Sequence, residues 1–283
     1  MRLFRDLKHL YIMTVIVVGI GFGALLNAVS EKTDARVYAL ASSVIFMGVC
    51  FLLVFCLNKV AAKRIQKIHL QRTDHCRIAP YIALYKKWCG LKIPQRQKDL
   101  CRMALSTGYI EVGDFDKAKH LLQEVQTTFL DTTEGMFAMA CYYNNYAVCL
   151  LNEKNAQGAA ASLGYMERAI ESERLTESER EPLQQAYRIK RYMLDMLTGD
   201  YDGAMAFFRQ LDESETTLPL ERVIARYWLG QIYLHDQEEG KAAGYLRFVA
   251  ENGGDTYYAA RARAQLAAMD TDHRNKETAV RDV

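Results

Sequence analysis

Two long stretches without a charged residue lie near the N-terminus of this 283-residue chain, from Leu10 to Val29 and from Val37 to Leu57. Each is about as long as a helix must be to cross a bilayer core of about 30 Å. Helices in soluble proteins are rarely this long and this apolar on every side. We therefore expect two transmembrane helices, which makes residues 1–58 a membrane anchor.

A cleavable signal peptide is the alternative for the first stretch. Arg2, Arg5 and Lys8 form a basic segment before it, and Ala28-Val29-Ser30 offers small residues at a cleavage position. The stretch is longer than the apolar core of about 7–15 residues that signal peptides use. This length favours a retained helix, and the second predicted helix does not depend on the choice.

Positive charge predicts the orientation, because loops rich in Lys and Arg stay in the cytosol. Basic residues precede the first stretch, and Lys59, Lys63, Arg64 and Lys67 follow the second, whereas the loop SEKTDAR between them is short and of mixed charge. We expect a multi-pass protein of the plasma membrane with its N-terminus and the rest of the chain in the cytosol. The basic run chiefly sets this topology, but it could also bind anionic headgroups with about 1 kcal/mol per residue.

Two glycines in the first stretch, Gly19 and Gly23, have the spacing that lets helix backbones approach closely. Packing against the second predicted span explains them as well as contact with another protein does.

The remainder of the chain predicts an all-α fold. From about residue 97 to 270, apolar residues recur at three- and four-residue spacing, and no alternating strand pattern is present. Short polar turns interrupt the pattern, for example at Gly113-Asp114 and Gly199-Asp200. We expect a basic helical linker over residues 59–96, including a helix over 78–89, and a polar tail over 271–283. A last helix is expected from Asp255-Thr256 to Met269.

A motif recurs within these helices: a Leu-Gly-x-x-Tyr pattern on one helix, then a small residue followed four positions later by a large one. The clearest copy has Gly230 and Tyr233, then Ala242 and Leu246. The other copies contain these residues: Leu105, Tyr109, Ala118 and Leu122; Ala147, Ala159 and Leu163; Ala204 and Phe208. The pattern resembles tetratricopeptide repeats (TPRs), which implies an α-solenoid of helical hairpins following the membrane anchor.

Departures from the repeat pattern indicate a divergent stack. The four alanines of the motif are 41, 45 and 38 residues apart, where the family has about 34. Asp195 stands where the third copy should have Tyr. The charged run over residues 171–181 predicts a solvated connection, which accounts for the longest step.

The resemblance also implies a concave groove lined by the first helix of each hairpin. Its register assigns these residues to the groove: Met103, Ile110, Asn144, Val148, Ile189, Met193, Tyr227 and Gln231. This apolar lining suits a hydrophobic segment or an amphipathic helix of a partner. Some family members clamp a carboxylate, and the clamp positions correspond to Met103, Thr107, Asn145, Ala186 and Lys190. Only Asn145 and Lys190 suit that role, so we do not expect such a clamp.

No motif for catalysis, a cofactor or a metal site is present. The phosphate-binding, zinc-protease and hydrolase patterns are missing, and the six histidines are scattered. Seven cysteines without a C-x-x-C pair indicate a reducing compartment, and a net charge of +2 offers no argument for nucleic acid. We interpret Gly253-Gly254-Asp255 as a helix C-cap glycine followed by an N-cap aspartate.

These observations favour a membrane-anchored interaction scaffold that is not an enzyme and that binds a protein partner through its repeats. The alternative is an accessory subunit of a membrane enzyme, transporter or envelope-assembly complex that associates through its transmembrane helices. An unrecognised enzyme is the third and weakest possibility.

Overall fold

The computed structural model describes residues 35–129 and 135–281. Within these two ranges all regular structure is helical, with helices α2 to α12 and one short 3-10 helix, η1 (Thr127–Phe129), so the all-α prediction is confirmed there. The first predicted span, with Gly19 and Gly23, lies outside the described residues. The chain divides into two compact units, Met1–Ile68 and His69–Val283.

Helix α2 (Ala35–His75) runs without a break from the apolar stretch into the basic segment. No proline interrupts these 41 residues, and one acidic residue, Asp74, occurs at the very end. From Val44 onward the helix is long and apolar enough to cross a membrane, with a mean hydropathy of 2.3 over its most apolar window. Its large apolar side chains are exposed, including Met47 and Phe51. Among the described residues it is the one helix with these properties.

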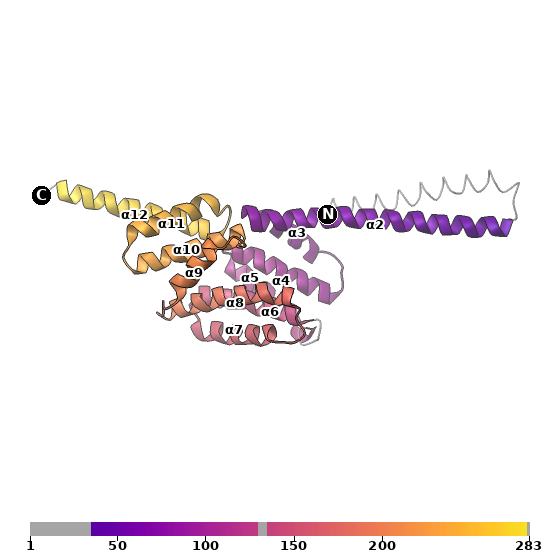
Figure 1. Ribbon diagram of the computed structural model, residues 1–283, viewed down its shortest axis with the longest axis horizontal. Helices are drawn as coiled ribbons and strands as arrows, with labels where there is room; N and C mark the ends of the chain where they lie inside the picture. The colour runs from indigo at the N-terminus through magenta and orange to yellow at the C-terminus, as the bar shows by residue number, and fades with distance from the viewer. Residues whose placement is uncertain (1–34, 130–134, 282–283) are drawn as a thin grey trace. The chain divides into compact units, whose positions relative to one another are not determined.

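The second unit is a succession of helices in which chain neighbours pack together (Figure 1). The helix predicted over 78–89 is confirmed as α3 (Ala79–Cys89), and Pro94 precedes the next helix. Three pairs of consecutive helices pack closely: α4 (Gln95–Glu111) with α5 (Phe115–Gln123), α6 (Met136–Asn152) with α7 (Ala156–Ile170), and α10 (Pro219–His235) with α11 (Glu239–Asn252). The fourth pair, α8 (Glu177–Leu197) and α9 (Ala204–Glu213), is looser, because α8 packs mainly on α6 and α7 and α9 on α10. Its two helices touch through the stacked rings of Tyr192 and Phe207. Helix α12 (Tyr257–Arg281) comes last.

Each pair contains one copy of the sequence motif, and its small residue lies in the core. The second helices of the four pairs carry one fully buried alanine each: Ala118, Ala159, Ala204 and Ala242. The large residue one turn later is buried too: Leu122, Leu163, Phe208 and Leu246. A small side chain lets two helices approach closely, and the large one fills the space beside the contact. At Gly230, for instance, a Cβ atom would lie 3.0 Å from the end of the Leu246 side chain, so Leu246 would have to shift to make room for it.

The start of the last helix differs from the prediction. Gly253 ends α11 as expected, but Asp255 is not the N-cap of α12, so that assignment is wrong. Thr256 has this role, since its Oγ1 accepts a hydrogen bond from the Ala259 amide (3.3 Å). The helix also continues past Met269 to Arg281, because neither glycine nor proline follows to end it.

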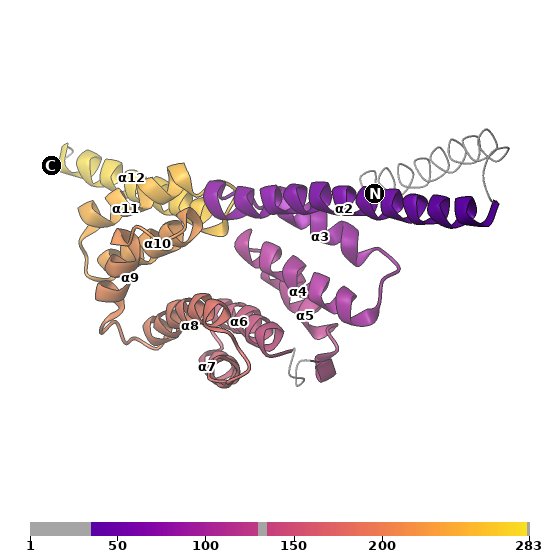
Figure 2. The same cartoon turned by 45° about the vertical axis from the view of Figure 1, so that its right-hand side comes forward.

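The helices of the second unit follow one another around an arc, and the beginning of α12 returns to α4 (Figure 2). Tyr257 packs on the turn after α4 and on Phe115, the first residue of α5. Its ring packs edge-on against Phe115 with centroids 5.2 Å apart. A Cβ at Gly113 would lie 2.5 Å from Tyr257, so only glycine leaves room for the ring, and the positive φ of Gly113 suits glycine as well. The two ends of the helix succession therefore meet.

Candidate functional site

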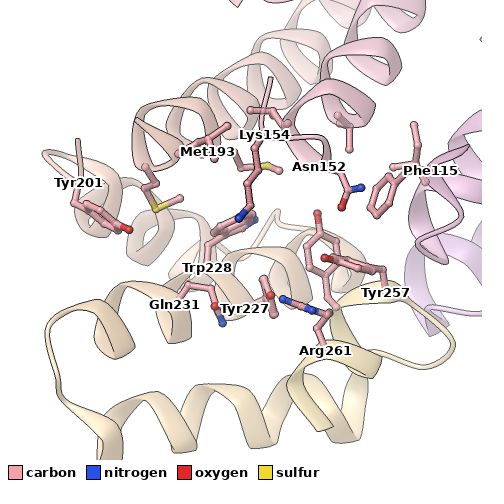
Figure 3. A pocket seen from close by; sticks show the side chains of 16 residues that line it. Phe115, Asn152, Lys154, Met193, Tyr201, Tyr227, Trp228, Gln231, Tyr257 and Arg261 are labelled. Carbon is pink, nitrogen blue, oxygen red and sulfur yellow. The ribbon is translucent and has the colours of Figure 1, made fainter. Parts of the chain in front are cut away.

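A cavity of about 470 Å³ lies inside this arc (Figure 3). Its volume is in the range of sites that hold small ligands or a few side chains of a bound chain. Six helices and two turns contribute its 16 lining residues: Ile110, Phe115, Val148, Leu151, Asn152, Lys154, Met193, Met196, Leu197, Tyr201, Tyr227, Trp228, Gln231, Tyr257, Tyr258 and Arg261. No member of this set is an acid, a histidine or a cysteine.

Buried apolar side chains form the floor of the cavity. Val148 and Leu151 on α6 and Met193 and Met196 on α8 line it and are buried. These helices also pack on each other through their neighbouring residues, which are part of one hydrophobic core. The floor is therefore held by the same packing that holds the helices together. Methionine adapts its shape easily, which suits a surface that receives different apolar groups.

Aromatic rings from α10 and α12 form a wall. Tyr227 packs against Trp228 with ring centroids 5.5 Å apart, and against Tyr258 at 5.1 Å. Burial raises the pKa of both tyrosines, so their hydroxyl groups stay protonated at neutral pH and can donate hydrogen bonds. The Trp228 Nε1 atom is buried and has no hydrogen-bond partner of normal geometry. The indole N–H of Trp228 lies near the Tyr258 hydroxyl and lowers the pKa of that hydroxyl. Burial of Tyr258 has the larger effect, so its pKa is raised overall.

Two cations lie at the solvent-exposed rim, Lys154 and Arg261. Lys154 occupies the turn after α6 with a positive φ of 57°, and its amide donates to the Leu151 carbonyl (3.1 Å). The next residue, Asn155, caps α7 by accepting from the Gly158 amide (2.9 Å), so the turn is well defined. Figure 3 shows the Lys154 side chain extending toward Trp228 and the Arg261 guanidinium lying beside Tyr227. A hydrogen bond to Tyr227 raises the pKa of Arg261.

Gln231 and Gln265 hold α10 and α12 together next to the cavity. Each side-chain amide donates to the other's oxygen, at 3.0 and 2.9 Å. Such a reciprocal pair satisfies one donor and one acceptor of each amide. Gln231 keeps a second N–H for a bound group.

The cavity brings together part of the groove predicted from the repeat register. Five of the eight predicted residues line it: Ile110, Val148, Met193, Tyr227 and Gln231. Met103 and Ile189 are buried in hydrophobic cores instead. Asn144 is half-buried away from the cavity lining and donates to the Asn145 side chain (3.1 Å). Whether a partner binds these residues stays a prediction.

The residues considered for a carboxylate clamp do not line the cavity. Asn145 is buried between α4 and α6, where its amide donates to the Met103 carbonyl (3.2 Å) and to Thr107 (2.8 Å). Burial lowers the pKa of Lys190 to about 8, despite the opposing effect of Glu111 and Glu221. Asn145 thus links two helices, which is a structural role.

The lining residues that come from turns and from the last helix were not predicted from the repeat register. Lys154 and Tyr201 lie in turns, and Tyr257, Tyr258 and Arg261 belong to α12, which the repeat motif does not cover. Periodicity within one helix carries no signal for such positions.

Comparison with protein-family models, with curated proteins and with solved structures found no match to this chain.

Proposed function

We propose that this protein is a membrane-anchored interaction scaffold whose TPR-like helical domain holds a segment of a partner protein in the cavity. The observation that carries the proposal is the composition of the cavity, in which aromatic and methionine side chains from several helices surround one space. Surfaces of this kind bind apolar side chains of partners, and methionine lets them adapt. The proposed activity is binding, without a cofactor.

The helical pairs support assignment of the domain to an α-solenoid of TPR-like hairpins. Four successive pairs carry a buried alanine at the same motif position, and hydrophobic cores connect one pair with the next. Repeat domains of this type usually provide binding surfaces, because each hairpin adds area to a continuous face. The resemblance supports a role in protein binding by analogy with the family.

The exposed apolar part of α2 supports the second of two membrane spans. We propose a hairpin of two spans in the plasma membrane, with the N-terminus and the helical domain in the cytosol. Epitope tags at both termini should then be protected from protease in intact cells and digested after permeabilisation. Digestion of the N-terminal tag in intact cells, or its loss by processing, would contradict the two-span hairpin.

Site-specific photo-crosslinking in native membranes tests the role of the cavity. A benzoyl-phenylalanine at Tyr201, which lines the cavity, should crosslink the partner. The matched control is the same substitution at Tyr165, a partly exposed tyrosine on α7 that does not line the cavity. Equal crosslinking at both positions, or none at Tyr201, would refute binding in the cavity.

A third crosslinking position distinguishes the alternative function, an accessory subunit that associates through its membrane helices. Phe51 on α2 is 75% exposed. A partner that crosslinks at Phe51 and not at Tyr201 would favour the accessory subunit over the scaffold.

A further inference from the structure

The charged residues that line the cavity are all positive. Lys154 and Arg261 are its two cations, and none of the 16 lining residues is acidic. In the described parts of the chain, no carboxylate forms an ion pair with either of them. Arg261 interacts instead with the phenol of Tyr227, and its guanidinium lies over the Tyr257 ring, 6.0 Å from the ring centroid. Neither cation therefore has an acidic partner among the described residues.

The cations and the apolar side chains of the cavity differ in exposure. Lys154, Arg261 and Asn152 are exposed, whereas Val148, Leu151, Met193 and Met196 are buried. In Figure 3, Trp228 and Tyr227 lie between Lys154, which extends toward Trp228, and Arg261, which lies beside Tyr227. A ligand held in this cavity can therefore contact a cation and apolar side chains at the same time.

We propose that the segment held in the cavity is acidic and apolar, with an aromatic or long aliphatic side chain on the methionine floor and a neighbouring carboxylate between Lys154 and Arg261. This inference rests on the proposed function and adds the chemistry of the partner. Hydrogen bonds between ionised groups are about twice as strong as neutral ones, and opposite charges reject wrong partners. A basic segment of the same apolar content is excluded by the two cations.

A peptide selection on the full-length protein tests the inference without knowledge of the natural partner. The protein is placed in nanodiscs of zwitterionic lipid, so that no lipid charge attracts peptides. A displayed library of random seven-residue peptides is selected on the wild type. Each enriched peptide is then synthesised in two forms. The acidic form keeps its Asp and Glu residues, and the amide form has Asn and Gln in their place.

Binding is read from the fluorescence of Trp228. The chain has two tryptophans, Trp88 and Trp228, so the variant Trp88→Phe leaves the cavity tryptophan as the single reporter. In this background, Lys154→Gln and Arg261→Gln should each weaken binding of the acidic peptide roughly tenfold, the equivalent of about 1.4 kcal/mol. Arg261→Lys should recover part of the loss. Arg247→Gln is the control, because it removes an exposed arginine of α11 outside the cavity.

The outcomes separate the inference from the proposed function. Enrichment of peptides that combine acidic with aromatic or aliphatic residues, and their loss of affinity in the cavity variants but not in Arg247→Gln, supports the inference. Peptides that bind at Trp228 equally well in acidic and amide forms would overturn it and leave the scaffold function intact. Failure to enrich any peptide that changes Trp228 fluorescence would overturn both.

Discussion

The carboxylate of Asp255 caps helix α3 from a position 177 residues further along the chain. Its Oδ1 accepts a hydrogen bond from the Ile78 amide (2.6 Å), and its Oδ2 accepts one from the Ala79 amide (3.0 Å). The Asp255 amide donates to the Cys76 carbonyl (3.2 Å) in return. Since Ile78 has no side-chain acceptor to cap α3, Asp255 satisfies backbone groups that would otherwise lack partners. The same turn leads into Tyr257 and the wall of the cavity.

Removal of this cap should destabilise the second unit. We expect Asp255→Ala to lower the free energy of unfolding by about 0.5–2 kcal/mol, the range for loss of an N-cap. Urea unfolding in mild detergent, followed by the fluorescence of Trp88 and Trp228, measures the change. Both tryptophans belong to the second unit, so the signal reports on it alone.

Asp114→Ala is the control for the Asp255 prediction, because Asp114 caps α5 within its own turn (3.4 Å to the Lys117 amide). Both variants lose a carboxylate cap, but only Asp255→Ala should speed amide hydrogen exchange at the start of α3 and at the start of α12 together. Unchanged exchange at α3 in Asp255→Ala would show that the long-range cap contributes nothing.

Gly254 should tolerate no side chain. Its φ is +57°, and a Cβ there would collide with the Cys76 carbonyl oxygen. Gly199 has φ +90° as well, but a Cβ would meet no atom within 4 Å. We expect Gly199→Ala to cost about 1 kcal/mol for backbone strain, and Gly254→Ala to cost about 1–3 kcal/mol more for the clash. Equal losses in urea unfolding would mean that the approach of Gly254 to Cys76 is not tight in solution.

The ion pair of Arg72 and Glu111 should be strongly coupled. Arg72 Nε donates to both Glu111 oxygens (3.0 and 2.8 Å), and the side chains are 20% and 12% exposed. The guanidinium also lies over the Tyr81 ring, 5.0 Å from its centroid. A double-mutant cycle with Arg72→Met and Glu111→Gln should give a coupling energy of about 1–3 kcal/mol, because water screens the pair poorly.

The more exposed pair of Lys119 and Glu153 is the reference for that cycle. Lys119 Nζ and Glu153 Oε1 are 2.7 Å apart, yet the two side chains are 25% and 37% exposed. We expect a coupling energy of about 0.2–1 kcal/mol. If the coupling energy of Arg72 and Glu111 is no larger than that of Lys119 and Glu153, burial does not strengthen the ion pair.

Lys190 should make stability rise with pH. Its pKa is about 8 in the folded protein, against an ordinary value of 10.5, because burial disfavours the ammonium. Between these two pH values the unfolded chain binds more protons than the folded one, so stability increases with pH. At pH 7 Lys190 is charged in both states and its burial is unfavourable, so Lys190→Met should raise the melting temperature. This advantage should shrink as the pH approaches 9.5.

Melting curves of the full-length protein between pH 7 and 9.5 measure the difference between wild type and Lys190→Met. Lys86→Met removes an exposed lysine of α3 and should give a curve parallel to that of the wild type. A constant difference between Lys190→Met and the wild type across this range would rule out a lowered pKa.

Local sequence patterns predicted the helices well because they depend on residues close together in the chain. The small residue of each motif copy and the large residue one turn later identified the helical pairs, as Ala118 with Leu122 and Ala242 with Leu246 illustrate. The register placed Ile110 and Met193 at the cavity, but Met103, seven residues before Ile110, is buried in the core. Periodicity predicts which residues lie on the apolar side of a helix. It does not predict which of them pack in the core and which line the cavity.

Local patterns were enough to predict helices in the described parts of the chain, the long apolar helix α2, and the residues that pack the helical pairs. They could not predict that Asp255 caps α3, that Tyr257 packs on Phe115, or that Lys154 and Arg261 line one cavity. The residues of each of these contacts are far apart in the chain. Helix periodicity and motif spacing record interactions over a few residues, whereas these contacts join positions that only the curvature of the whole helix succession brings together.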